Sequence, residues 1–305
     1  MSISYLRNVL EEIENLDSVS VQLLRITNNK SGTQYFARQI EIQPEEDLSS
    51  FMKNLSEKYL GLIESVDSVD DYCGDIVKGN IYKLSVDDEM IAEYFKSLEV
   101  VTANPSTEGD VVGRNWNAFF IKGKAKVLSE DKDVMLFSMK SPVSVLTNKY
   151  LLSGKDRFKR LNEPILTLNK NLDAVVVNGT LYMITMQAEN LFNMERSYRK
   201  RCDEKVEEVI MLDILTNSDA FVNIATKGQN PRRFVSFNQS RLDAIKNTNS
   251  RKKYMKMFQI SMKDGQIDTD DEKSSERLVK FLCDKAMLDP IDEKPREVSA
   301  AKAWL

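Results

Sequence analysis

Residues 173–185 read Asp-Ala-Val-Val-Val-Asn-Gly-Thr-Leu-Tyr-Met-Ile-Thr, and they carry the clearest fold signal of the chain. β-Branched and aromatic residues stand on both sides of Asn178-Gly179, the pair of residues that a two-residue hairpin turn favours. The stretch therefore predicts two antiparallel strands, 173–177 and 180–185, joined by a tight turn.

The rest of the 305-residue chain also divides into strands with short turns and amphipathic helices. We expect strands over 19–27, 34–42, 116–127, 133–139 and 165–168, helices over 45–63, 87–98, 188–209 and 272–287, a further helix from about 240 and a strand over 257–262. Because helices and strands do not alternate as βαβ units, the pattern favours an α+β fold, with hairpin-rich mixed sheets packed with amphipathic helices. We expect two sub-domains: an acidic domain over 1–140 and a second domain over 141–305, which begins near Ser141-Pro142 and contains a basic middle block.

The helix expected over 188–209 carries one apolar stripe at three- and four-residue spacing. Its members are Leu191, Met194, Tyr198, Cys202, Val206 and Val209. Cys202 is therefore expected to face the core, where packing is favoured over chemistry. In the helix expected over 272–287, the inward residues are Leu278, Val279, Leu282, Cys283 and Ala286.

The chain contains no histidine, and this excludes several classes of enzyme. Ser–His and Cys–His nucleophile pairs and histidine-ligated zinc or haem cannot form. Cys73, Cys202 and Cys283 are far apart and include no CxxC pair, which argues against a structural zinc site and a disulfide framework. The glycine-rich phosphate loops of nucleotide-binding folds are missing as well.

The sequence offers no signal for crossing a membrane. Its longest apolar runs reach four or five residues, whereas a membrane helix needs roughly 20. Acidic residues follow closely on the first eight positions, so the start does not read as a signal peptide. We therefore expect a cytosolic protein.

The formal net charge is −4, but the charge is unevenly distributed. Residues 1–148 hold 15 Lys/Arg against 24 Asp/Glu, residues 149–262 hold 20 against 12, and residues 263–305 hold 8 against 11. A basic middle block between acidic flanks is typical of a protein that meets a polyanion on one face. An ordinary mixed surface is the alternative.

The basic block contains nine candidate contacts to DNA. They are Arg196, Arg199, Lys200, Arg201, Arg232, Arg233, Arg251, Lys252 and Lys253. The first four project from the helix expected over 188–209, mostly opposite its apolar stripe, the next two close a Gly/Pro loop that starts at Lys227, and the last three open a run to Lys256 that includes Tyr254. A fourth basic cluster is Lys155, Arg157, Lys159 and Arg160. These residues do not form a recognisable pattern for reading base edges, so we expect contacts to the DNA backbone without strong sequence preference.

Each cluster also has an interpretation without DNA. On the long helix, Glu195–Arg199, Arg199–Asp203 and Lys200–Glu204 have the spacing of a salt-bridge ladder, and for this helix alone that interpretation is slightly favoured. Tyr254 can anchor its element in the core while the lysines around it remain in water.

A metal-dependent nuclease is the main enzymatic alternative, because paired carboxylates and a lysine need no histidine. The candidates are Asp67, Asp70, Asp71 and Asp75 with Lys78, Asp173 with Glu189, Glu130 with Lys132, and Asp203 with Lys205. None clearly lies on a hairpin beside a second strand-borne acid, and such groupings arise by chance when 30% of residues are charged. We assign no catalytic residue, no metal ligand and no cofactor, and interpret 268–272 as a helix N-terminus, not a calcium loop.

Three segments of the second half resemble a known bacterial family. They are 164–184, the helix that follows with Leu191-Phe192, and Phe258-Gln-Ile-Ser-Met-Lys-Asp-Gly-Gln-Ile267. They are similar to the KwaB family of the Kiwa anti-phage defence system, which is catalogued for a domain of unknown function, and the likeness is strongest over 141–305. The resemblance implies a protein that binds DNA, hinders invading phage DNA and works with a small KwaA-like membrane protein at the inner face of the membrane. The shared motif marks a hairpin and names no active site.

Together these lines favour an anti-phage defence protein that binds DNA backbone and is recruited from the cytosol to the membrane by its partner. An adaptor or effector is favoured over an enzyme, and a homo-oligomer, a dimer, is expected. Two alternatives stay open: the metal-dependent nuclease, and a protein-interaction scaffold that does not bind nucleic acid.

Overall fold

The chain folds into two compact units. The computed structural model describes residues 3–29, 32–41, 45–74, 79–106, 116–139, 150–153, 157–160 and 170–298. Unit 1 comprises Met1–Asp71 and Gly79–Met194, and unit 2 comprises Tyr72–Lys78 and Glu195–Leu305. Both helices and hairpin-rich sheets are present, which confirms the α+β class. Ser141-Pro142 and the strand expected over 165–168 lie outside the described residues.

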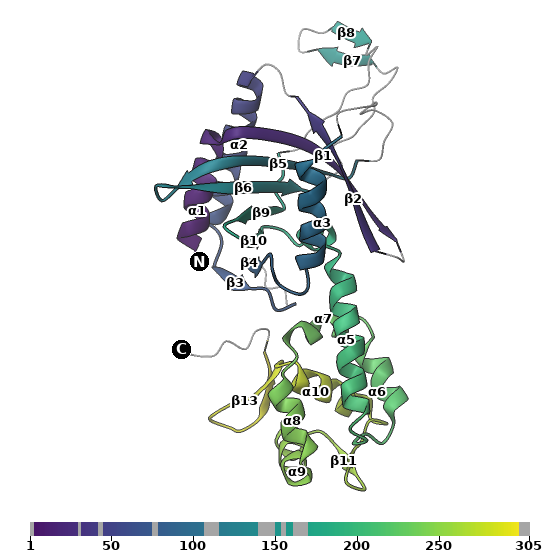
Figure 1. The fold of residues 1–305 in the computed structure, drawn as a ribbon. Helices are drawn as coiled ribbons and strands as arrows, with labels where there is room; N and C mark the ends of the chain where they lie inside the picture. Colours follow the sequence, from purple (N-terminus) through teal and green to yellow (C-terminus); the bar gives the residue numbers. More distant parts are fainter. Residues whose placement is uncertain are drawn as a thin grey trace. The chain divides into compact units, whose positions relative to one another are not determined.

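Unit 1 is built on an eight-stranded sheet with the order β2-β1-β5-β6-β9-β10-β4-β3 (Figure 1). Its strands are β1 (Asp17–Asn29), β2 (Gly32–Ile40), β3 (Ser68–Asp71), β4 (Asn80–Ser85), β5 (Ala118–Val127), β6 (Glu130–Ser138), β9 (Ala174–Val177) and β10 (Thr180–Met183). All neighbours are antiparallel except β3 and β4, which are parallel. A separate hairpin pairs β7 (Tyr150–Ser153) with β8 (Arg157–Arg160).

The predicted hairpin at Asn178-Gly179 is confirmed. Val177 pairs with Thr180, and Asn178 and Gly179 have φ of 50° and 69°, the positive values that a type I′ turn requires at both central positions. β9 also pairs with β6, and β10 with β4, so the hairpin lies inside the sheet of unit 1. The division between the units consequently falls after Met194 and differs from the one expected at 140/141.

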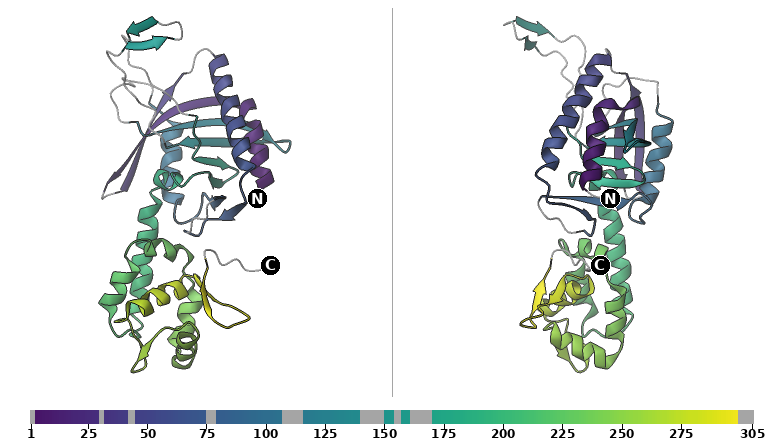
Figure 2. Two further views of the ribbon diagram at one scale, coloured as in Figure 1. Left: turned by 180° about the vertical axis from the view of Figure 1, so that it is seen from behind. Right: turned by 90° about the vertical axis from the view of Figure 1, so that its left-hand side faces the viewer.

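Helices cover both faces of this sheet. α1 (Ile3–Glu11), the 3-10 turn η1 (Glu12–Asn15) and α2 (Glu45–Ile63) lie on one face, and α3 (Ala92–Ala103) lies on the other (Figure 2). Since side chains alternate along a strand, Phe119 joins the core under α1 and α2, while Phe120 turns the other way and contacts Phe137 with ring centroids 4.9 Å apart. Phe192 then contacts both Phe137 and Phe95 of α3.

Unit 2 is mainly helical. Its helices are α5 (Met194–Ile210), which starts at the last residue of unit 1, α6 (Ser218–Ala225), α7 (Asn230–Arg233), α8 (Gln239–Lys246), α9 (Thr248–Met257) and α10 (Glu272–Leu282), with the 3-10 turn η2 (Phe234–Ser236). Two short hairpins pair β11 (Met262–Lys263) with β12 (Gln266–Ile267) and β13 (Ala286–Leu288) with β14 (Pro295–Glu297). Its core includes Cys202 and Cys283, both fully buried as predicted.

Several element boundaries differ from expectation, among them the helix expected over 87–98, which is α3 (Ala92–Ala103). The helix expected over 188–209 is broken at Asn193, where φ is 47°, into α4 (Ala188–Leu191) and α5. The strand expected over 257–262 shrinks to β11, because α9 continues to Met257. The helix expected over 272–287 ends at Leu282: Asp284 takes a φ of 53°, and the Lys285 amide donates to the Lys280 carbonyl, which closes the helix.

Side-chain caps fix where several helices of unit 2 begin. Asn217, Asn238, Asn247 and Asp271 each accept hydrogen bonds from backbone amides of the helix that follows. The cap at Asp271 confirms that 268–272 leads into a helix. Among the helices of the described residues, none combines the length and apolar character needed to cross a membrane.

Candidate nucleic-acid interface

A row of exposed lysines runs along α9. Lys256 follows Lys253 by three residues and Lys252 by four, so the three lysines lie within about 100° of one another on one side of the helix. All three are exposed, α9 contains no acidic residue, and none of the three forms an ion pair within the part of the chain that the structure describes. We call Lys252, Lys253 and Lys256 the lysine row.

The opposite face of α9 belongs to the core of unit 2. Met255 is fully buried, and the Tyr254 ring lies 5.9 Å from that of Phe281. Tyr254 thus anchors the helix in the core, as the interpretation of this cluster without DNA expected. The cap at Asn247 and these core contacts hold the lysine row on a well-supported helix.

Arg251 was expected among the DNA contacts, but it is 9% exposed. Its guanidinium donates to the carbonyls of Ile245 at 3.2 Å and Gly265 at 3.4 Å, which ties α8 and the β11–β12 turn to α9. This corrects the expectation for Arg251, because a guanidinium committed to buried carbonyls is not available to phosphates. Lys252, the next residue of the helix, is exposed.

Two of the four candidate cations on α5 are paired with acids of the same helix. Arg199 Nε lies 2.9 Å from Glu195 Oε1, and Lys200 Nζ lies 3.8 Å from Glu204 Oε1. The hydrogen bond with Glu195 raises the pKa of Arg199. Arg196 is exposed and forms no ion pair within the described residues, whereas Arg201 is half-buried. The salt-bridge ladder therefore explains two of these four cations.

Arg232 and Arg233 do not lie on an exposed loop. They form the end of α7, and both are half-buried. Arg233 donates to Asn230 Oδ1 at 2.8 Å and to Glu297 Oε1 at 3.1 Å, and the Arg232 guanidinium lies 5.7 Å from the centre of the Tyr198 ring. The Gly/Pro loop expected from Lys227 to these arginines is corrected, since Pro231 lies in the first turn of a short helix that contains both of them.

The basic clusters of unit 2 do not converge on one patch. α7 and α9 lie at opposite ends of this unit in every view (Figures 1 and 2). Arg157, Lys159 and Arg160 belong to β8, and Lys155 lies outside the described residues.

The carboxylate of Asp173 has a structural position in unit 1. It is 4% exposed and accepts hydrogen bonds from the Met139 amide at 2.7 Å and the Thr185 hydroxyl at 2.5 Å. Its backbone carbonyl also accepts from the amides of Ile184 and Thr185. Asp173 therefore joins the end of β6 to both strands of the β9–β10 hairpin.

The other acid–lysine groupings are also engaged in local pairs. Glu130 pairs with Lys132 at 2.5 Å, Asp71 with Lys83 at 3.4 Å, and Lys205 with Glu208 at 2.6 Å, and Asn80 donates to Asp70. Asp75 and Lys78 lie outside the described residues. Over the described ranges, no group of three or more acidic or sulfur side chains is placed to hold a metal ion.

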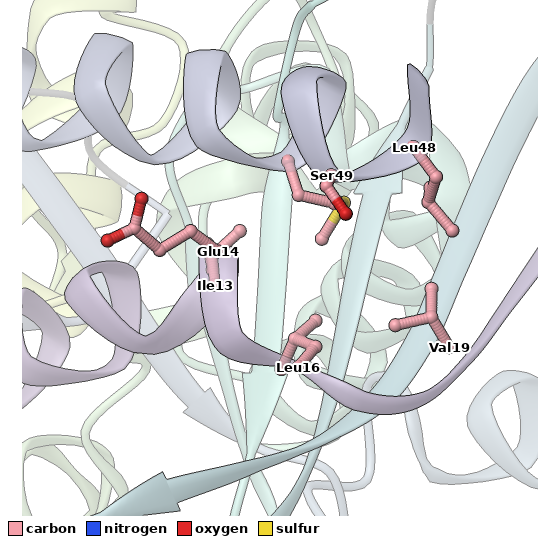
Figure 3. Close-up of a pocket in the computed structure, with 7 residues that line it drawn as sticks. Ile13, Glu14, Leu16, Val19, Leu48 and Ser49 are labelled. Carbon is pink, nitrogen blue, oxygen red and sulfur yellow. The ribbon is translucent and has the colours of Figure 1, made fainter. Parts of the chain in front are cut away.

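The described residues of each unit line a cavity. A groove of about 300 Å³ in unit 1 is lined mainly by apolar side chains of η1, β1 and α2, and Figure 3 shows Val19 and Leu48 facing each other across it. A second cavity of about 180 Å³ in unit 2 is lined by Arg277, Lys280, Lys285 and Arg296. Sequence reasoning missed this cluster, because its members are spread over an acidic tail and meet only where α10 turns into the β13–β14 hairpin.

Comparison with known proteins identifies one family. The family model described as Kiwa protein KwaB-like matches residues 124–291, more than half of the chain. The match starts within β5 and ends in the turn between β13 and β14, so it covers most of unit 2 and the central hairpin of unit 1. No curated protein matches the chain. No solved structure matches it either.

Proposed function

The chain belongs to the Kiwa KwaB-like family, which gives it a role in Kiwa-type anti-phage defence, and we propose that it fulfils this role by binding DNA backbone without strong sequence preference. The ligand in this proposal is a polyanion, and the helical unit 2 is the part of the chain that binds it.

The lysine row is the observation that carries this proposal. Like charges at i,i+3 and i,i+4 positions repel one another and cost a helix about 0.2–0.5 kcal/mol per pair. On α9 no acid of the same helix offsets that cost. A row of ammonium groups on one helix is suited to the regularly spaced phosphates of nucleic acid, and it offers no hydrogen-bond pattern that would select a base.

Exposed cations of α5 form a secondary cluster, apart from the lysine row and near α7. Arg196 is exposed and forms no ion pair in the described residues. To contact phosphates, Arg199 and Lys200 must first break their exposed pairs with Glu195 and Glu204. Exposed pairs are worth at most about 1 kcal/mol, so this exchange is inexpensive. We assign the main contacts to Lys252, Lys253 and Lys256, with Arg196, Arg199 and Lys200 as supporting contacts.

A membrane partner and self-association complete the proposal. We propose that a KwaA-like membrane protein recruits the chain to the inner face of the membrane, and that two copies associate, which would double the number of lysine rows on one DNA molecule. Expressed alone, the protein should remain in the supernatant after membranes are pelleted. Co-expressed with the partner, it should move to the pellet, and light scattering of the purified protein should give twice the 35.0 kDa mass of one chain.

One titration separates the proposal from its two alternatives. Purified protein is added to covalently closed plasmid DNA at several salt concentrations, with and without magnesium. Salt-sensitive retardation of intact plasmid supports the backbone-binding adaptor. Nicking or linearisation that requires magnesium would establish the nuclease, and plasmid that migrates unchanged at low salt would leave the scaffold.

A further inference from the structure

We infer that the cavity between α10 and the β13–β14 hairpin is a binding site for a single phosphate group of a nucleotide or of a DNA end. The site is separate from the lysine row. It goes beyond the proposed function, because backbone binding by α9 does not require it.

The charge of the cavity is the first argument. Arg277, Lys280, Lys285 and Arg296 line it, and Glu297 is the one acidic side chain among its lining residues in the described chain. Arg277 and Lys280 stand three residues apart on one face of α10, while Lys285 and Arg296 come from the turn and from β14. Four cations from three segments therefore line one space, and one of them, Arg296, also pairs with Asp292 at 3.0 Å and with Asp289 at 3.4 Å.

The second argument is that the cluster is built into the fold. Lys285 is 2% exposed, and its backbone is held on both sides: its amide donates to the Lys280 carbonyl at 2.8 Å, and its carbonyl accepts from the Val298 amide at 3.1 Å. Arg277 Nη1 donates to the Gln259 carbonyl at 2.5 Å, which leaves its other donors for a ligand. Burial of a lysine is costly unless it has a partner, and Lys285 has an interaction of its own within the chain, so its position is fixed by the fold.

The position of Glu297 indicates what the cavity accepts. Glu297 Oε2 lies 2.8 Å from Lys280 Nζ, and its other oxygen lies 3.1 Å from Arg233 Nη2. A carboxylate thus already occupies one side of the cluster, as a partial internal substitute for an anion. Arg277 forms no ion pair in the described part of the chain, and it is exposed at the mouth of the cavity.

Size limits the ligand to a small group. The cavity holds about 180 Å³, whereas sites that enclose drug-sized molecules have about 300–1,000 Å³. A phosphate fits within such a space, and a nucleoside attached to it would extend out of the cavity. Phe258, Ala286 and Pro295 supply an apolar wall, which strengthens charge–charge attraction inside.

The test measures binding to the full-length protein by calorimetry. Inorganic phosphate and deoxyadenosine 5′-monophosphate are expected to bind, and deoxyadenosine is not. Arg277→Gln should weaken phosphate binding about tenfold, because it removes a charge-assisted hydrogen bond. Glu297→Gln should strengthen binding, because it removes the competing carboxylate. Lys273→Gln is the matched control: Lys273 is exposed on α10 but does not line the cavity, so this variant should bind as the original protein does.

Two further arms separate the sources of the phosphate and separate this inference from the proposed function. If a 5′-phosphorylated duplex binds more tightly than its 5′-hydroxyl form and Arg277→Gln removes the difference, the ligand is a DNA end; if only the mononucleotide responds, it is a free nucleotide. Covalently closed plasmid has no ends, so its binding should not change in Arg277→Gln. Absence of phosphate and mononucleotide binding, or an equal loss in Lys273→Gln and Arg277→Gln, would overturn the inference.

Discussion

The Asp173 carboxylate accepts a 2.7 Å hydrogen bond from the amide of Met139, and this contact fixes the end of β6 to the start of β9. Together with the bond from Thr185, it uses the acid that a nuclease would have needed next to the hairpin. The hydrogen bonds of Asp173 therefore give this residue a structural role at the β9–β10 hairpin.

A stability measurement tests the structural role of Asp173. Asp173→Ala leaves a backbone amide and a hydroxyl without their acceptor, so we expect a loss of about 2–4 kcal/mol in the free energy of unfolding. Denaturant titration of the full chain measures it. Asp131→Ala, at an exposed position of β6, should change the free energy by less than about 0.5 kcal/mol. Equal losses of unfolding free energy in the two variants would contradict the structural role of Asp173.

Two glycines in different backbone conformations should respond to substitution in opposite directions. Gly179 has a φ of 69° and Gly61 lies inside α2, and an added Cβ would meet nothing within 4 Å at either position. Gly179→Val should cost about 1–3 kcal/mol, because a β-branched residue is strained at positive φ. Gly61→Ala should stabilise the protein by about 0.5–1 kcal/mol, because alanine favours the helix. Thermal melting compares the two variants, and a neutral Gly179→Val would refute the turn type.

Neighbouring residues of α9 should separate stability from binding. Arg251→Ala removes a buried guanidinium that bonds two carbonyls, and should lower the free energy of unfolding by on the order of 2 kcal/mol. Lys252→Gln with Lys253→Gln should leave the melting temperature nearly unchanged and weaken DNA binding. Melting curves and plasmid titrations on the same samples provide the comparison. A destabilised lysine variant, or an Arg251→Ala variant as stable as the original, would contradict the assignment.

Thiol reactivity should distinguish the three cysteines. Burial raises the pKa of the Cys202 thiol to about 12 and raises that of Cys283 as well. Neither forms thiolate at pH 8, so neither should react with a disulfide reagent while the protein is folded. Cys73 is less buried and should give one fast-reacting thiol, which Cys73→Ser should abolish. In urea all three should react. Two fast thiols in the folded protein would show that unit 2 opens around its core.

The sequence predicted local structure better than long-range pairing. The β9–β10 hairpin followed from turn chemistry at Asn178-Gly179, because the strands it joins are neighbours in the chain. Its outer partners β6 and β4 could not be predicted, because strand order depends on contacts across the whole of unit 1. The division between the units depends on that same pairing.

Side-chain burial in α9 could have been predicted more fully than it was. Arg251, Met255 and Phe258 follow the spacing of one helical face, so the buried position of Arg251 was present in the periodicity. Its positive charge, taken alone, places Arg251 in one group with Lys252 and Lys253. The phosphate cavity was beyond such reasoning, because Arg277 and Arg296 are brought together by a turn that the pattern extended as a helix.

The salt dependence of DNA binding tests the central claim most directly. Each phosphate neutralised on duplex DNA contributes about −0.9 to the slope of log affinity against log salt. The triple variant Lys252→Gln, Lys253→Gln and Lys256→Gln should flatten that slope by about 2–3 units and weaken unrelated sequences equally. The control triple, Lys96→Gln, Lys124→Gln and Lys126→Gln, changes exposed lysines of unit 1 and should leave the slope unchanged. An unaltered slope in the α9 variant, or an equal change in the control, would contradict DNA binding through the lysine row.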